Sequence, residues 1–307
     1  MHILFLTDNF PPEVNAPASR TSEHCREWVR SGCKVTVITC APNFPRGRVF
    51  DGYRNRLWQE EDKDGIRVIR VWSYITANEG FFLRILDYVS YMITASFASL
   101  FVRKVDVVVG TSPQFFTACA AFFVGTMKRR PWVFELRDIW PESIRAVGAM
   151  QDSAALRFLE KVELFLYRKS KMIVAVTNAF RNNLVKRGID PDKIKVITNG
   201  ADTGRFKPRE KDAALVAEFG LKGKFVVGYV GTHGMAHALG TLLDAARSCR
   251  GRDSADTEIQ FILLGDGSEK AQLMQRAREE GLDTVIFIDS VAKDQVARYW
   301  SLLDASI

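Results

Sequence analysis

The 307 residues are 47% hydrophobic and 26% charged, a composition typical of a globular protein and not of a disordered chain. This length favours about two domains, because a single hydrophobic core stops growing beyond roughly 250–300 residues. The net charge of +7 indicates either a polyanionic partner or simply a surface of solvated lysines. Five cysteines without a CxxC pair, in a chain without a signal peptide, predict reduced thiols in a cytoplasm.

Strand and helix patterns alternate through the first two thirds of the chain. Apolar, β-branched runs predict strands at 2–7, 34–40, 67–72, 106–110, 132–135, 172–176 and 194–197. Helical patterns occupy 18–31, 81–102, 115–128, 154–169 and 178–187. This alternation predicts βαβ units and a parallel sheet. We therefore expect an α/β fold with a complete Rossmann-like domain over residues 1–200.

A second α/β pattern follows a polar linker at 201–222, which contains a short predicted helix. Strands are expected at 225–230, 258–264 and 284–288, with helices at 238–248, 269–280 and 294–302. Residues 302–307 then read as the start of another buried strand, so we expect the second domain, 223–307, to be an incomplete Rossmann-like unit. Open α/β sheets bind ligands at the carboxyl ends of their strands. Two such domains facing a cleft would hold a donor on one side and an acceptor on the other.

A glycine-spaced loop, with Gly228, Gly231 and Gly234, lies between a predicted strand and a predicted helix. Its backbone amides could approach an anion at a helix N-terminus, and the alternative is a tight turn that needs positive φ. His233 and His237 stand four residues apart and would face the same anion if one helical turn carried both. No carboxylate or third histidine joins them at ligand spacing, so a metal pair is not expected.

Two further strand ends are predicted to line the same ligand pocket as the glycine-spaced loop. Gly265, Asp266 and Gly267 follow one strand, and Val291 follows the next. We expect these four residues on the nucleotide-base side of a ligand.

Polar loops also follow strands of the first domain. The proline-rich loop after the first strand is expected to be ordered, and it offers Pro12, Glu13, Asn15 and Arg20 as candidate acceptor-binding residues. Arg137 and Asp138 follow a later strand and could position a hydroxyl or a sugar, or they form a salt bridge that fixes the loop. Asn199 is either half of a turn dipeptide with Gly200 or a ligand contact between the domains.

Five motifs in order carry a resemblance to a known family: PPE, RDIWPES, ITNGADTGRFKP, GYVGTHGMAHALGTLLDAA and LLGDGSEK. The chain resembles retaining GT-B glycosyltransferases of family 4 over all 307 residues. It is most similar to a bacterial polysaccharide branch that includes the colanic-acid and fucosamine-transferase group. The resemblance implies two Rossmann-like domains, a nucleotide-sugar donor (a UDP-sugar favoured), retention at the anomeric carbon, and no metal or other cofactor.

The resemblance also implies roles for individual residues. The donor diphosphate would be bound by Gly231, Thr232, His233, Gly234 and His237. The family's usual Arg and Lys in this loop are replaced by Thr232 and His237, so the backbone must supply more of the neutralisation, with help from His233. The family's His-Asp pair appears here as Arg137-Asp138, which leaves Asp138 to contact the transferring sugar. The family's Glu-x7-Glu element is expected beyond position 307, so this chain is expected to bind donor weakly and to be inactive.

The acceptor is inferred from charge and from one apolar segment. The uninterrupted apolar run at 88–102 has 15 residues, fewer than the roughly 20 that span a bilayer. We expect a packed helix there, with a helix in the membrane interface as the alternative. Together these features favour a lipid-linked sugar acceptor and a cytoplasmic protein in peripheral contact with the anionic inner face of the plasma membrane.

Two other functions compete with this interpretation. A NAD-dependent sugar-modifying oxidoreductase or epimerase would need a G-x-G-x-x-G after the first strand, where the chain instead reads DNFPP. For a non-catalytic polyanion-binding protein the basic residues are too dispersed, and no nucleic-acid-binding motif is present. No nucleic-acid partner is therefore expected.

Overall fold

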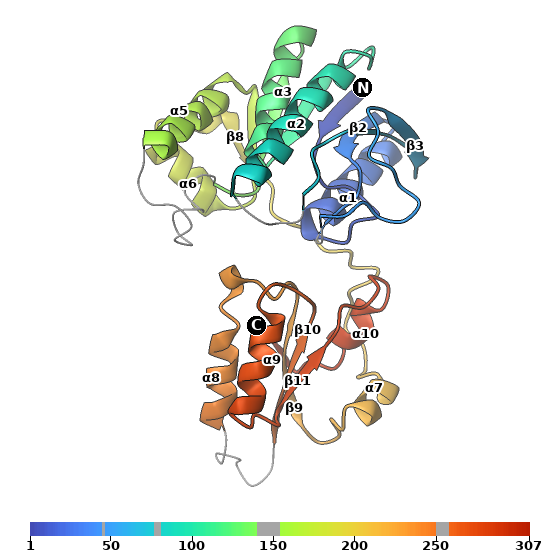
Figure 1. Ribbon diagram of the computed structural model, residues 1–307, viewed down its shortest axis with the longest axis vertical. Helices are drawn as coiled ribbons and strands as arrows, with labels where there is room; N and C mark the ends of the chain where they lie inside the picture. The colour runs from blue at the N-terminus through green and yellow to red at the C-terminus, as the bar shows by residue number, and fades with distance from the viewer. Residues whose placement is uncertain (45–46, 77–80, 140–153, 250–257) are drawn as a thin grey trace. The chain divides into compact units, whose positions relative to one another are not determined.

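The computed structural model of the chain describes residues 1–44, 47–76, 81–139, 154–249 and 258–307. The chain divides into two compact units, Met1–Asn199 and Gly200–Ile307, and each unit has its own sheet and hydrophobic core (Figure 1).

The first unit is built on an eight-stranded sheet in the order β3-β4-β2-β1-β5-β6-β7-β8. The strands are β1 His2–Leu6, β2 Lys34–Cys40, β3 Gln59–Lys63, β4 Ile66–Val71, β5 Val107–Thr111, β6 Trp132–Leu136, β7 Met172–Ala175 and β8 Ile194–Val196. Every neighbouring pair is parallel except β3 with β4. The predicted parallel sheet is therefore confirmed, and its central strands are mostly apolar because helices cover both faces.

Among the strands that the structure describes, the edge strand β3 is the one that the sequence did not predict. Its residues, QEEDK, are all polar, as suits an edge where charge discourages further pairing. Asp64 and Gly65 both have positive φ, 59° and 77°, and form the tight turn into β4. Across this hairpin the guanidinium of Arg67 donates to both carboxylate oxygens of Glu60, at 2.6 and 2.8 Å.

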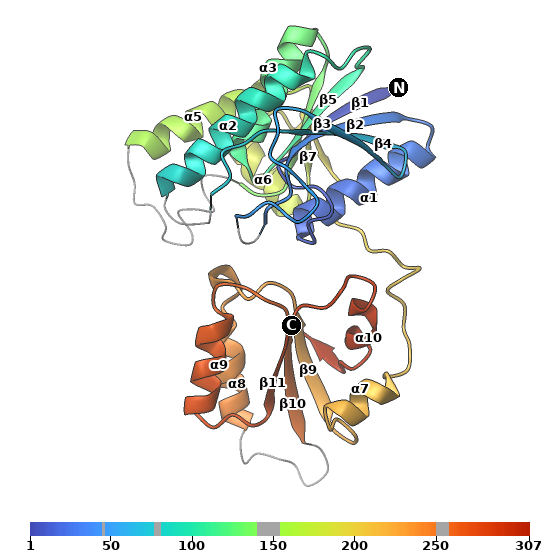
Figure 2. The ribbon, with the colours of Figure 1, turned by 45° about the vertical axis from the view of Figure 1, so that its right-hand side comes forward.

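Helices cover both faces of this sheet (Figure 2). They are α1 Ala16–Arg30, α2 Phe81–Ser99, α3 Phe115–Lys128, α5 Ala154–Lys169 and α6 Asn178–Lys186. Strand alternation divides the core, since Leu4 and Leu6 belong to the cluster that includes α2 and α3, while Ile3 and Phe5 pack with α1. Among the described residues, no helix combines the length and the apolarity that crossing a bilayer requires.

The second unit has a four-stranded parallel sheet in the order β11-β10-β9-β12. Its strands are β9 Phe225–Val230, β10 Ile259–Leu264, β11 Val285–Ile288 and β12 Ala305–Ser306. Its helices are α7 Ala213–Glu218, α8 Gly240–Cys249, α9 Lys270–Glu279 and α10 Val296–Trp300. Ala305 pairs with Val227 of β9, so the predicted strand at the last residues of the chain is confirmed.

The second half of the predicted linker is part of the core of this unit. Leu215 of α7 and Leu221 are buried in one cluster with Leu302. The carboxylate of Asp212 caps α7 and accepts a 2.8 Å bond from Arg298 of α10. Hydrophobic burial therefore joins α7 to the second unit.

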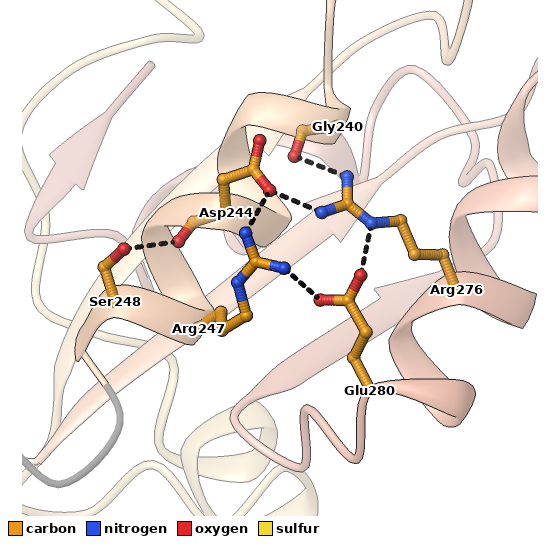
Figure 3. A network of polar contacts seen from close by, with 6 residues as sticks. All are labelled: Gly240, Asp244, Arg247, Ser248, Arg276 and Glu280. Carbon is orange, nitrogen blue, oxygen red and sulfur yellow. Dashed lines mark hydrogen bonds and ion pairs between the residues drawn. The ribbon is translucent and has the colours of Figure 1, made fainter.

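A polar network joins α8 to α9 (Figure 3). Arg276 of α9 pairs with Asp244 of α8, and its Nε donates to Glu280 at 2.6 Å. Its Nη1 also donates to the carbonyl of Gly240 at 3.2 Å. Arg247 lies 3.1 Å from Asp244 and 3.5 Å from Glu280. These contacts fix the start of α8.

Candidate functional site

The loop after β9 and the loop after β10 lie side by side and are joined by backbone hydrogen bonds. The amide of Gly231 donates to the carbonyl of Leu264 at 3.0 Å, and the amide of His233 donates to that of Asp266 at 2.9 Å. The carbonyl of His233 accepts from the amide of Glu269 at 2.9 Å. Two of the sequence-predicted donor-site segments are therefore brought together at the carboxyl edge of the sheet.

The close approach of these loops explains the glycines of the second one. A Cβ on Gly265 would stand 1.9 Å from the carbonyl oxygen of Gly231, and one on Gly267 would stand 2.3 Å from that of His233. Gly265 also has a φ of +146°, which L side chains rarely adopt. By contrast, Gly234 has a φ of −120°, so the positive-φ explanation considered for that glycine does not apply.

The first loop leaves backbone donors available for a ligand. Within the described residues, no hydrogen bond uses the amides of Thr232 and Gly234. Thr232 is exposed and Gly234 is half-buried. Unused backbone amides in a loop at a strand end are suited to bind phosphate oxygens.

His233 is fully buried beside this loop, and neither ring nitrogen has a hydrogen-bond partner. Burial lowers its pKa, and the nearby charge of Lys270 lowers it further. The imidazole is therefore neutral at pH 7. It can offer a ligand a hydrogen bond but no positive charge, so it does not compensate electrostatically for the family's missing cations.

The sequence allowed His233 and His237 to share one helical turn, but in the structure they do not. His237 is exposed at the end of a three-residue 3₁₀ turn, Met235–His237, which Ala238 ends with a φ of 48°. The two imidazoles instead lie near the ring of Tyr229, at centroid distances of 6.1 and 5.8 Å. Helix α8 begins only at Gly240, so the expected helix N-terminus does not directly follow the loop.

A buried lysine that the sequence interpretation missed holds the loop after β11, the third loop, in place. Nζ of Lys270 donates to the carbonyls of Gly265 at 2.8 Å and Ile288 at 3.2 Å. It also donates to the carboxylate of Asp289 at 2.5 Å. Lys270 thereby ties together the carboxyl ends of β10 and β11. Val291, predicted on the base side, is half-buried and packs against the core below them.

In the first unit, Arg137 is held by a buried polar cluster at the end of β6. Its side chain is 4% exposed and forms an ion pair with Glu135. Nη1 donates to Oδ1 of Asn199 at 3.1 Å, and Nη2 lies 3.5 Å from Nδ1 of His24. The alternative of an Arg137–Asp138 salt bridge is therefore wrong, because Glu135 is the carboxylate that faces the guanidinium.

Electrostatics keep Glu135 ionised. Burial alone would raise the pKa of this carboxyl, but the hydrogen bond from His24 and the charge of Arg137 outweigh it and lower the pKa to about 2. The imidazole of His24 lies 3.3 Å from the carboxylate. Glu135 and His24 were missed from the sequence, although a Glu inside an otherwise apolar strand indicates a buried, paired charge.

Arg20 of α1 adds a second cation near this cluster. Burial lowers the pKa of its guanidinium to about 10, and the charge of Arg137 acts in the same direction. The Nε atoms of both arginines are buried without a hydrogen-bond partner. Two guanidinium groups therefore face one ionised carboxylate in this cluster, and the carboxylate of Asp138 follows at the same strand end.

Asp138 is half-buried, and its backbone is fixed by Ser112 at the end of β5. Oγ of Ser112 accepts from the amides of Arg137 at 2.7 Å and Asp138 at 3.1 Å. Within the described part of the chain, the Asp138 carboxylate takes part in no hydrogen bond or ion pair. It therefore remains available for a ligand. Trp140, Pro141 and Glu142 of the same motif lie outside the described residues.

The proline-rich loop is ordered by its own side chains. Oε1 of the buried Glu13, beside Pro12, accepts from the amides of Asn43 at 2.8 Å and Phe44 at 2.9 Å. Burial raises the pKa of Glu13 to about 7, and its second oxygen has no partner. Asn15 caps α1 by accepting from the amide of Ala18 at 2.8 Å. Across the described ranges, no three His, Cys, Asp or Glu side chains converge to form a metal site.

Comparisons with known proteins identify the family to which the chain belongs. Residues 15–200 match the glycosyl transferase 4-like domain. The putative colanic acid biosynthesis glycosyl transferase WcaI of Escherichia coli K12 is 22% identical over 298 residues, which cover 94% of this chain and 71% of that protein.

Two solved structures have similar folds. The Anabaena Alr3699/HepE complex with UDP-glucose has a TM-score of 0.68 at 17% identity and covers 100% of this chain and 73% of its own. Sucrose-phosphate synthase from Thermosynechococcus elongatus has a TM-score of 0.74 at 13% identity, and the match covers 99% of this chain and 74% of that one. The expected GT-B fold is thereby confirmed. Since the family match spans more than half of the chain, this protein belongs to the glycosyl transferase 4-like family and is a glycosyltransferase.

Proposed function

We propose that this protein transfers a sugar, with retention at the anomeric carbon, from a nucleotide-sugar to a lipid-linked or glycan acceptor in cell-surface polysaccharide biosynthesis. The observation that carries the proposal is the pair of interlocked loops after β9 and β10, which leaves two amides unused at a sheet edge. The HepE complexes with UDP and with UDP-glucose support a UDP-sugar as the donor. WcaI supports the polysaccharide pathway.

The donor diphosphate would be bound by the first loop. The amides of Thr232 and Gly234 donate to its oxygens, and the neutral His233 adds one uncharged hydrogen bond. As the bond from the anomeric carbon to the diphosphate breaks, negative charge grows on the leaving phosphate. Fixed amide donors aimed at that charge stabilise it without reorganisation. No step needs a metal, and metal independence remains part of the proposal.

The base side of the donor would lie along the second and third loops, formed by Gly265, Asp266, Gly267 and Val291. Asp266 is exposed, and its carboxylate already accepts from the amide of Gly267 at 2.8 Å, which orients the loop. Lys270 holds both loops from below. The loops therefore provide a preformed surface, which lowers the ordering cost of nucleotide binding.

The acceptor would bind the first unit. Beside the acceptor, the catalytic residue Asp138 offers its free carboxylate to the transferring sugar, and Arg137 is positioned next to it by Glu135 and Asn199. The positive charge from Arg20 and Arg137 favours an acceptor that carries phosphate, such as a sugar linked through pyrophosphate to a lipid. An acceptor of this kind implies peripheral contact with the inner face of the plasma membrane.

A titration of the 307-residue chain with UDP, NADH and single-stranded DNA, followed by tryptophan fluorescence, separates the three functions considered. The proposal predicts saturable UDP binding, with no saturable binding of NADH or of DNA at 150 mM salt. Saturable binding of NADH would favour the oxidoreductase. DNA binding that weakens steeply with salt would favour the polyanion-binding protein.

A further inference from the structure

We infer that the outward side of α2 and α3, together with the loops that follow α2, α3 and α5, docks the first unit on an anionic lipid surface. The inference rests on the proposed function in one respect, since a lipid-linked acceptor brings the enzyme to a membrane. It specifies the surface that makes the contact. Three observations carry it: an apolar stripe, a group of cations beside it, and the near absence of acidic residues among those cations.

The apolar stripe consists of Ile93, Phe97, Leu100 and Phe101 from α2 and its end, with Phe123 and Met127 from α3. Each of these side chains is 43–64% exposed. The inward side of α2 is apolar as well, because Tyr91, Ala95 and Ala98 are buried against the sheet. A surface helix is ordinarily polar on its outer side, so an apolar outer side indicates a partner.

Aromatic contacts order the stripe along α2 and join α3 to α5. The rings of Phe97 and Phe101 lie 5.5 Å apart, and Trp58 contacts Phe101 edge-on at 6.1 Å. Phe122 of α3 contacts Phe165 of α5 at 5.3 Å, so the three helices form one layer on the sheet (Figure 2). Tryptophan and phenylalanine are the side chains that favour the boundary between headgroups and acyl chains.

The cations, which we call the basic end, are Arg103, Lys104, Arg129, Arg130, Arg168 and Lys169, all of them exposed. They gather because α2, α3 and α5 each lead into a parallel strand, β5, β6 or β7. Their C-terminal ends therefore lie together at the amino edge of the sheet, opposite the edge that carries Arg137 and Asp138. Two hydrogen bonds hold these ends together. Nζ of Lys128 donates to the carbonyl of Val102 at 2.8 Å, and Nε1 of Trp132 donates to that of Lys169 at 3.2 Å.

Little negative charge offsets the basic end within its own loops. Two acidic residues, Asp190 and Asp192, lie beside it in the turn whose Lys193 donates through Nζ to the carbonyl of Arg168 at 2.6 Å. In the loops that join the three helices to their strands, the one acidic residue is Asp106, and its carboxylate accepts from the amide of His2 at 2.7 Å. Six exposed cations next to exposed aromatic side chains match a bilayer with anionic headgroups over an apolar interior. A contact between two copies of this surface would fit less well, because it would bring the like charges of two basic ends together.

The test is co-sedimentation of the full 307-residue chain with vesicles of phosphatidylcholine containing 30% phosphatidylglycerol, at 100 mM salt. The first variant removes three cations of the basic end, by Arg103→Gln, Arg130→Gln and Lys169→Gln. Its matched control removes three exposed cations from the second unit, by Lys207→Gln, Lys222→Gln and Arg278→Gln. The second variant removes two rings of the stripe, by Phe97→Ser and Phe101→Ser. Circular dichroism confirms that each variant is folded.

The inference predicts that the wild type and the control bind the anionic vesicles equally, and that the basic-end variant binds about tenfold to a hundredfold more weakly. The ring variant binds the vesicles more weakly by a similar factor, including at salt concentrations that screen the charges. Equal binding by the basic-end variant and its control would overturn the inference. So would a wild-type dimer that the ring variant converts to a monomer while vesicle binding is unchanged. UDP titration of the same samples separates failure here from failure of the proposed function, because neither variant touches the nucleotide loops.

Discussion

Replacing Glu135 with glutamine tests the electrostatic account of the first unit most sharply. In the folded unit the pKa of Glu135 is about 2, against an ordinary value of 4.5. At 1.36 kcal/mol for each pH unit, this difference corresponds to about 3 kcal/mol of stability at pH 7. Removing one partner of a buried ion pair lowers the free energy of unfolding by a similar amount, about 3–5 kcal/mol. Here Arg137 would be left buried without its carboxylate.

The pH dependence follows from the sign of the shift. A depressed carboxyl pKa stabilises the fold above its unfolded value, so the contribution of Glu135 is complete above about pH 5 and disappears as the pH falls from 4.5 towards 2. Glu135→Gln should therefore destabilise the first unit by about 3 kcal/mol at pH 7 and by much less near pH 2.5.

Urea unfolding followed by tryptophan fluorescence measures both values, since the first unit contains Trp28, Trp58, Trp72 and Trp132. The matched control is Glu60→Gln, which breaks the exposed pair with Arg67 and should cost at most about 1 kcal/mol. A Glu135→Gln deficit no larger than that of the control at pH 7 would refute the reasoning. So would a deficit of the same size at both pH values.

Three further predictions concern other residues of the two sites. Glu13→Gln should stabilise the protein at pH 8 but not at pH 4, because burial raises the pKa of Glu13 to about 7 and its ionisation opposes folding; thermal melts at both pH values decide this. Lys270→Met should destabilise the second unit by about 1–3 kcal/mol, since two buried carbonyls lose their donor, and should weaken UDP binding in the same titration. In a protein active in sugar transfer, Asp138→Asn should lower kcat and leave the Kd for UDP unchanged; an equal loss in both would place Asp138 in donor binding instead.

The parallel strands could be predicted because each is a run of apolar residues in a chain that alternates strand with helix. Strand β3 could not, because all five of its residues are polar. The positions of the glycine loops were predicted from their strands. Their interlocking was not, because the approach of Gly265 to the carbonyl of Gly231 depends on how two loops meet in space.

The polar residues that support each site were the least predictable. Glu135 lies two residues before Arg137, the strand spacing that puts both on one face, but nothing in the sequence links His24 to either of them. Lys270 stands at the start of α9, where a lysine ordinarily points into solvent, yet here it is buried under two strand ends. Such contacts depend on the tertiary arrangement of elements that lie far apart in sequence.

The central claim is that the interlocked loops bind the nucleotide diphosphate, and calorimetric titration of UDP into Gly267→Ala tests it most directly. The added Cβ would lie 2.3 Å from the carbonyl oxygen of His233, so the first loop must move and its free amides with it. The matched control is Gly200→Ala, whose Cβ meets nothing within 4 Å. We predict at least about tenfold weaker UDP binding by Gly267→Ala and unchanged binding by Gly200→Ala. Equal UDP affinity in the two folded variants would contradict the claim.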